Sequence, residues 1–158
     1  KQEYEPNEAG AKYVKEYLNM EVNCISFQIE ACKNEKQIRE LITYIKENNC
    51  KAGLVISPKT PIEEVFEYIP YIHKVIVMTV EPGKGGQELI PETIQKIFTL
   101  NKFVYENGYD IDIQADGGIN ELTAKQVTDA GANILVAGNY ITSSADLKKS
   151  IQVLKQKI

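Results

Sequence analysis

Three segments of the chain end an apolar run in glycine, and the middle one places a carboxylate just before its glycines. They are residues 75–87, 111–120 and 134–140, and in the second of them Asp116 precedes two glycines. Glycine lets a backbone come close to a ligand, and backbone N–H groups that point at one spot bind anions. The pattern therefore predicts a phosphate site at the ends of strands, with Asp116 beside it.

The elements that must position these segments alternate between strand and helix along the chain. Strands that alternate with helices of this length form parallel βαβ units, and nearly continuous apolar strands fit a sheet that is buried on both faces. We expect five strands, each followed by a helix, and one leading helix. The expected strands are residues 24–31, 51–57, 74–80, 110–115 and 133–137, and the expected helices are 7–20, 36–48, one from Thr60, 91–107, 120–131 and one from about Ser144.

Local patterns predict where several helices begin and which face they bury. The sequence Thr60-Pro-Ile-Glu63 is typical of a capping box with proline at the first helical position. Asn120 is expected to cap the next-to-last helix, which Gly131 ends. In the closing helix, one side is expected to carry Leu147, Ile151 and Leu154.

The order of the glycine segments favours a barrel over an open doubly wound sheet. An open sheet usually places its glycine-rich phosphate loop after the first strand, whereas here the glycines follow the last strands. In (β/α)8 barrels, phosphate commonly binds at the loops after strands seven and eight. A barrel needs about 250 residues, so we interpret residues 1–158 as one barrel domain seen as strands four to eight, without its first βα units.

The amino-acid composition argues against several classes of function. The formal net charge is −4 and 43% of the residues are hydrophobic, which fits a packed domain and argues against nucleic acid as a partner. The only arginine, Arg39, is expected on a solvated helix face rather than on a phosphate. Three cysteines without a framework spacing argue for a reducing, cytoplasmic setting. No segment is long and apolar enough to suggest a membrane partner.

Four segments together resemble the ribulose-phosphate 3-epimerase family. They are residues 27–31, 78–87, 114–119 and 136–139. The stretch Met-Thr-Val-Glu-Pro-Gly-Lys-Gly-Gly-Gln from Met78, followed by Asp-Gly-Gly-Ile, is specific, whereas a lone Asp-Gly-Gly occurs in many barrel enzymes. The resemblance extends from about Tyr4 to the C-terminus and implies a (β/α)8 barrel that interconverts ribulose 5-phosphate and xylulose 5-phosphate.

The resemblance also implies one divalent metal ion (Zn, Fe, Mn or Co), held by two histidines and two aspartates. Only the aspartate of the seventh strand maps onto this chain, at Asp116, because the other three ligands lie on strands two and three. His73 cannot replace them, since it precedes a strand and so lies at the wrong end of the barrel. Because Lys1 does not look like a natural beginning, we expect a part of a longer protein; the alternative is a reduced homologue.

The chemistry that the resemblance implies is proton transfer beside a ketone, with a base on one face of the carbon and an acid on the other. A metal ion stabilises the enediolate that forms. Asp116 would bind the metal and move one proton, and its partner would be an aspartate on the missing second strand. The simpler alternative is that Asp116 only caps the turn that follows it.

The resemblance assigns the remaining residues to phosphate, substrate and site wall. Phosphate would be bound by backbone amides of Gly117, Gly118, Gly138 and Asn139, the last standing where the family has serine. The loop of Gly83, Lys84, Gly85, Gly86 and Gln87 would close over the substrate. In it, Lys84 replaces an aromatic residue and either adds charge to the phosphate or points into solvent, and Gln87 either binds a sugar hydroxyl or braces the loop.

Three residues are candidates for the wall of the site. Met78 either covers the metal or is ordinary core packing. Gln28 stands where the family has histidine, and an amide cannot take up a proton as imidazole does. Glu30 keeps the carboxylate of the family and is expected near the site.

Two alternatives to a pentose-phosphate epimerase stay open. A six-carbon substrate such as allulose 6-phosphate would use the same motifs, because they bind phosphate and the reacting carbon rather than the chain length. A non-catalytic sugar-phosphate binder is the second alternative. Five βα units would leave strand edges at residues 24–31 and 133–137, which favour completion by a partner chain or a homo-oligomer.

Overall fold

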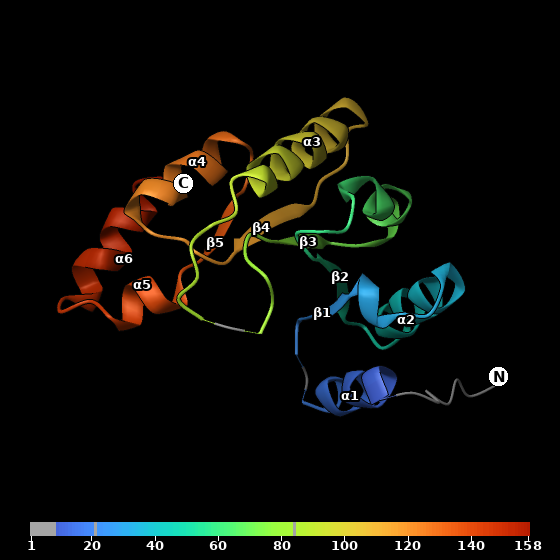
Figure 1. Cartoon of the computed structure of the whole chain (residues 1–158). Helices are drawn as coiled ribbons and strands as arrows, with labels where there is room; N and C mark the ends of the chain where they lie inside the picture. The colour runs from blue at the N-terminus through green and yellow to red at the C-terminus, as the bar shows by residue number, and fades with distance from the viewer. Residues whose placement is uncertain (1–8, 21, 84) are drawn as a thin grey trace.

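Five parallel strands pair in the order in which they occur in the chain (Figure 1). The computed structural model describes residues 9–20, 22–83 and 85–158. Since parallel crossovers are right-handed, a sheet in strict sequence order carries its helices on one face, as a barrel wall does. The strands are β1 (Cys24–Gln28), β2 (Lys51–Ile56), β3 (Lys74–Met78), β4 (Asp112–Asp116) and β5 (Ile134–Val136).

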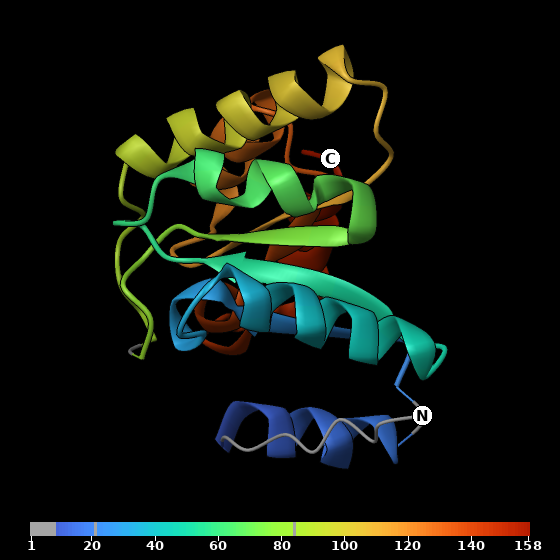
Figure 2. The same ribbon diagram turned by 90° about the vertical axis from the view of Figure 1, so that its right-hand side faces the viewer.

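The helices lie along the outer side of the curved sheet. In Figure 2, α3 (yellow) and α2 (light blue) run along opposite flanks of the strands, and α1 lies beyond α2, which it contacts. Within the described residues, no helix has the length and apolar character needed to cross a membrane. The helices are α1 (Ala9–Leu18), η1 (Ile29–Ala31), α2 (Glu35–Glu47), η2 (Ile62–Tyr71), α3 (Glu92–Glu106), α4 (Glu121–Asp129), α5 (Gly138–Thr142) and α6 (Leu147–Lys155), of which η1 and η2 are 3-10 helices.

Alternate residues of each strand face the helices and the inside of the curved sheet. In β3, Val75 and Val77 are fully buried, whereas Ile76 and Met78 between and after them are half-buried. This period of two is the geometry of a pleated strand. The helix-facing side therefore forms the core, in which Leu54, Ile56, Ala115, Ile97 and Leu100 are also completely buried.

The register aligns one row of residues at the carboxyl ends of three strands. Met78 of β3 lies opposite Asp116 of β4, which lies opposite Val136 of β5. All three are half-buried and belong to the inner face. Parallel strands bring their carboxyl ends to one edge, so the loops after β3, β4 and β5 meet there.

The first strand is shorter than the sequence pattern predicts. Pairing ends at Gln28, and residues 29–31 turn into η1, where the amide of Cys32 donates to the carbonyl of Ile29 at 3.0 Å. The carboxylate of Glu30 accepts a hydrogen bond from the backbone N–H of Ser57 at 2.8 Å. A contact between segments 27 residues apart thus ends the strand, and the local pattern could not reveal it.

The predicted capping box at Thr60 is wrong. The Thr60 hydroxyl donates to the Glu30 carboxylate at 2.5 Å instead of capping the next helix. The N-cap residue of η2 is Pro61, which makes no side-chain cap, and the segment is a 3-10 helix that contains Pro70. A proline in a helix removes one backbone donor, which is consistent with the irregular geometry.

The other helix signals agree better with the structure. The Asn120 side chain accepts from two backbone amides and forms a capping box with Thr123, as a start of α4 requires. The closing region differs, because a short α5 precedes α6, whose cap is Asp146. Leu154 is buried as predicted, but Leu147 and Ile151 are 52% and 40% exposed, so only part of the apolar stripe is covered.

Candidate functional site

A cavity of about 640 Å³ lies at the carboxyl ends of β3, β4 and β5. Its lining comes from the loops and strand ends of all three predicted glycine motifs and from α5.

 The predicted site residues that line the cavity are Met78, Gly83, Gly85, Gly86, Gln87, Asp116, Gly117, Gly118, Gly138 and Asn139, and the prediction for Lys84 lies outside the described residues.

Asp116 is the strand-end carboxylate of this cavity, which Glu81 and Glu88 of the loop after β3 also line. It ends β4, and its backbone carbonyl accepts a hydrogen bond from the amide of Thr79 at 2.8 Å, which fixes the strand end. Within the described part of the chain, its carboxylate makes no hydrogen bond or ion pair, so it does not cap the turn that follows. Burial raises the pKa of Asp116, because the charged form loses contact with water. A half-buried, unpaired carboxylate can accept a proton or bind a cation.

The two glycines after Asp116 are explained by close packing of loops. Gly117 and Gly118 have φ values of +121° and +63°. A Cβ atom on Gly117 would lie 2.4 Å from the side chain of Val80, and one on Gly118 would lie 2.4 Å from the backbone nitrogen of Leu89. The loop after β3 therefore lies directly against the loop after β4, and only glycine leaves room for it.

Gly138 differs from these glycines because no closely packed protein atom requires a glycine at its position. A Cβ atom there would have no neighbour within 4 Å, and its φ is not positive. Gly138 and Asn139 begin α5, where the first amides of a helix have no acceptor within the helix. The start of α5 thus combines an open Cβ direction at Gly138 with helix-terminal amides, the groups that bind anions at helix N-termini.

The loop after β3 reaches across the cavity towards α5. A Cβ atom on Gly86 would lie 3.8 Å from the side chain of Asn139. At the other end of the loop, the Gln87 side-chain amide donates to the carbonyl of Glu81 at 2.7 Å. Of the two predictions for Gln87, this contact supports the brace.

Gln28 and Glu30 do not line the cavity. The side-chain amide of Gln28 donates to the Ser57 hydroxyl at 2.8 Å, and Glu30 accepts hydrogen bonds from Ser57 and Thr60. Burial raises the pKa of Glu30, but these hydrogen bonds outweigh it and the net pKa is lowered. Both residues instead hold the turn at the end of β2.

The sequence pattern missed several residues of the site region. Val80, Leu89 and Tyr140 line the cavity, although none of them carries a chemical signature. The sequence pattern also missed Lys96 of α3, whose ammonium group contacts backbone carbonyls of residues 57–60. A lysine in an amphipathic helix does not by itself indicate contacts so far away in the chain.

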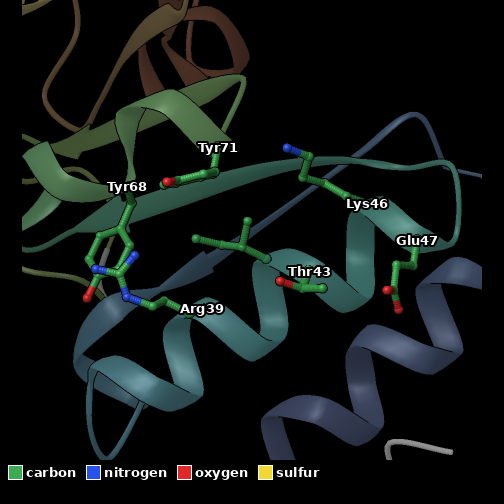
Figure 3. Close-up of a pocket in the computed structure, with 7 residues that line it drawn as sticks. Arg39, Thr43, Lys46, Glu47, Tyr68 and Tyr71 are labelled. Atoms are coloured by element: carbon green, nitrogen blue, oxygen red, sulfur yellow. The ribbon is translucent and has the colours of Figure 1, made fainter. Parts of the chain in front are cut away.

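A second cavity, of about 440 Å³, lies between α2 and η2 in the outer helical layer (Figure 3). Arg39 lies 5.2 Å from the centre of the Tyr68 ring and forms an ion pair with Glu67. Lys46 lies 5.9 Å from the centre of the Tyr71 ring. Arg39 therefore lies on an outer helix face, as expected, although it pairs with protein groups rather than only with solvent.

The described residues do not hold a metal ion by themselves. Among residues 9–20, 22–83 and 85–158, no group of three or more His, Cys, Asp or Glu side chains is arranged to bind one. Asp116 offers one carboxylate, whereas metal sites use several protein ligands. Any further ligands would have to come from outside these residues.

Comparison with known proteins identifies the relatives of the chain. The model of the ribulose-phosphate 3-epimerase family matches residues 8–142. Ribulose-phosphate 3-epimerase from Bacillus subtilis is 35% identical over 145 residues, which cover 91% of this chain and 65% of that protein. The one from Methanocaldococcus jannaschii is 39% identical over 136 residues, which cover 86% of this chain and 57% of that protein. The chain thus spans roughly three fifths of the length of these relatives.

Solved structures support the barrel class. A 3-hexulose-6-phosphate synthase from Salmonella typhimurium matches with a TM-score of 0.69 at 17% identity, covering 96% of this chain and 70% of that one. D-psicose 3-epimerase from Clostridium cellulolyticum matches with a TM-score of 0.60 at 9% identity, covering 96% and 66%. At such identities the likeness concerns the fold alone, and it confirms the predicted (β/α)8 barrel class.

Proposed function

Because this chain belongs to the ribulose-phosphate 3-epimerase family, we propose that the cavity beyond β3, β4 and β5 is the phosphate-binding half of an epimerase site. The substrate would be ribulose 5-phosphate, which would be converted to xylulose 5-phosphate by inversion at C3. The observation that carries the proposal is the unpaired Asp116 carboxylate in the same cavity as the free space at Gly138. The relatives named above support the pentose rather than the hexose substrate.

The phosphate would lie in front of α5. The amides of Gly138 and Asn139 would donate to its oxygens, and the loop after β4 would contribute Gly118. In barrels, the loops after the last two strands and a short extra helix commonly form such a site. Net charge of the chain is negative, so backbone amides rather than arginines would bind the anion.

Asp116 would transfer one of the two protons that inversion requires. The raised pKa of Asp116 lies closer to the pH of the cell than the pKa of an exposed aspartate does. A pKa nearer to the working pH favours proton transfer in both directions. Met78 lies opposite Asp116 in the sheet register and would form the apolar wall beside the reacting carbon. The second acid or base would come from outside the described residues.

The family implies a divalent metal ion, and Asp116 is the residue that would contribute a ligand to it. The described residues alone do not fit such an ion, because they offer no group of three ligands. We therefore assign no step of the reaction to a metal. The residues described here would bind the phosphate, orient the sugar and move one proton.

The test is Asp116→Asn in the protein that carries this chain. Epimerisation of ribulose 5-phosphate should fall by at least about 100-fold, the range of general acid–base catalysis, while the circular dichroism spectrum stays that of the parent. Asp112→Asn is the matched control, because Asp112 lies on the same strand at the opposite end of the sheet. Activity of the Asp116 variant within tenfold of the parent would refute the role of the carboxylate.

A non-catalytic sugar-phosphate binder is the second candidate, and it is favoured because the described residues hold no group of three His, Cys, Asp or Glu side chains arranged to bind a metal ion. Calorimetric titration with ribulose 5-phosphate, with and without added divalent metal, separates the two. Binding without turnover under both conditions supports the binder, and turnover supports the epimerase.

A further inference from the structure

The turn at the end of β2 is held by a half-buried cation. The ammonium group of Lys96 donates to the carbonyls of Ser57 at 3.0 Å and Thr60 at 2.5 Å, and also to that of Pro58. An ammonium group has three N–H donors, so this turn uses all of them. Burial lowers the pKa of Lys96, and nearby glutamates, Glu30 among them, offset part of that effect.

The same turn is also held by a carboxylate. One oxygen of Glu30 accepts from the amide of Ser57 at 2.8 Å and from the hydroxyl of Thr60 at 2.5 Å. Glu30 follows β1 and Lys96 lies in α3, so the two groups come from separate βα units. The turn is thus fixed both through its carbonyls and through its donors.

Two groups at the edge of the sheet depend on this turn. The Ser57 hydroxyl accepts the hydrogen bond of the Gln28 side chain, which lies on the inner face of β1. Lys59 forms an ion pair of 2.9 Å with Glu81, and the carbonyl of Glu81 accepts the bond from Gln87. The turn therefore connects β1 with the residues that line the cavity.

We propose that Glu30 and Lys96 are positioning residues that hold the turn of residues 57–60, and through it Gln28 and Glu81, at the mouth of the substrate site. The inference rests on the proposed function, since it takes this edge of the sheet as the substrate side. An apolar residue in place of Lys96 would pack at a lower desolvation cost. The contacts instead place a half-buried charge on the backbone of one turn.

The test follows amide resonances of the folded chain by NMR in Lys96→Met, which keeps the length of the side chain and removes its charge. The resonances of the Gln28 side-chain amide and of the Glu81 backbone amide should both move or broaden. Unchanged resonances at both sites, with changes confined to residues 57–60, would overturn the proposal. If Lys96→Met does not fold, Thr60→Val, which removes one donor to Glu30, replaces it with the same readout.

Two further variants separate the routes. Lys59→Met breaks only the link to Glu81, so Glu81 should respond and Gln28 should not. Lys102→Met is the matched control on the same helix, because its ammonium pairs with the exposed Glu106, and neither resonance should respond. An equal response to Lys102→Met and Lys96→Met would contradict the positioning role.

A titration with ribulose 5-phosphate distinguishes the failure of this inference from the failure of the proposed function. If the parent binds, the dissociation constant of Lys96→Met should rise roughly tenfold, the low end of what loss of a supporting partner costs at a functional site. An unchanged dissociation constant would count against the inference. If the parent does not bind, the proposed function fails for this chain, and the resonances of Gln28 and Glu81 still decide the positioning role.

Discussion

The polar groups at the two halves of the sheet edge differ in whether they have hydrogen-bond partners within the protein. Beyond β1 and β2, Gln28, Glu30, Thr60 and Lys96 all have hydrogen-bond partners within the protein. Beyond β4 and β5, the Asp116 carboxylate has none among the described residues, and Gly138 faces empty space. Satisfied networks stabilise a fold, whereas unpaired polar groups in a cavity are available to a ligand.

The comparison shows why a family motif and a functional role need not coincide in space. Glu30 and Asp116 are both acidic residues that the resemblance assigns to one site. Glu30 already accepts hydrogen bonds from the turn at residues 57–60, whereas the Asp116 carboxylate has no partner among the described residues. The number of hydrogen bonds that a carboxylate already makes is therefore the better guide to its role.

The largest expected effect on stability is that of Gly118→Ala. The new Cβ atom would lie 2.4 Å from the Leu89 backbone nitrogen, at a φ of +63° that alanine disfavours. We expect the free energy of unfolding to fall by about 2–4 kcal/mol, from overpacking and backbone strain together. Urea denaturation measures it. Gly85→Ala is the control, since a Cβ atom there meets nothing within 4 Å, and equal losses in the two variants would contradict the packing argument.

Thr60→Val tests the satisfied half of the edge. It removes the hydroxyl that donates to Glu30 and leaves that carboxylate with the Ser57 amide. The expected loss in unfolding free energy is about 1 kcal/mol, because the bond goes to a charged but partly solvated group. Thr99→Val on the surface of α3 is a matched control. A loss no greater than that of the control would show that the Glu30 contact adds no stability.

Asp116→Asn should stabilise the protein at neutral pH. Burial raises the pKa of Asp116 in the folded state, so the ionised form costs stability above that pKa, and the cost disappears as the pH falls below about 4, where the unfolded aspartate is protonated too. The gain of the variant over the parent should therefore shrink towards acid pH. Thermal unfolding from pH 3 to pH 8 measures it, and a variant less stable than the parent at pH 7 contradicts the prediction.

The smallest effect on stability is expected for Gly138→Ala. With no atom near the new methyl group, the unfolding free energy should change by less than about 0.5 kcal/mol. Binding should respond instead, because the methyl group would occupy the proposed phosphate space, with a loss of roughly tenfold in affinity for ribulose 5-phosphate. Calorimetry measures it, and unchanged affinity would move the phosphate away from α5.

Much of the site could be predicted from the sequence because its residues lie close together in the chain. The glycines of residues 83–86 and 117–118 follow strands whose apolar runs are plain, and parallel strands must bring their carboxyl ends to one edge. The capping box of Asn120 was also predictable, since its partners are within three residues. Local contacts leave a local pattern.

Longer-range contacts decided the rest. The Thr60 hydroxyl could cap the following helix or bond to Glu30. It bonds to Glu30, because the pairing of β1 with β2 brings that carboxylate within reach. The same holds for Lys96, whose three acceptors are 36 to 39 residues away in the chain. No spacing rule reports such partners.

The sequence by itself determined the alternation of strands and helices, the barrel class and the glycine-rich strand ends, because periodicity and backbone freedom are properties of short segments. Only the tertiary structure decided which acidic residue stays unpaired, because hydrogen bonds between βα units use up one carboxylate and leave the other facing the cavity.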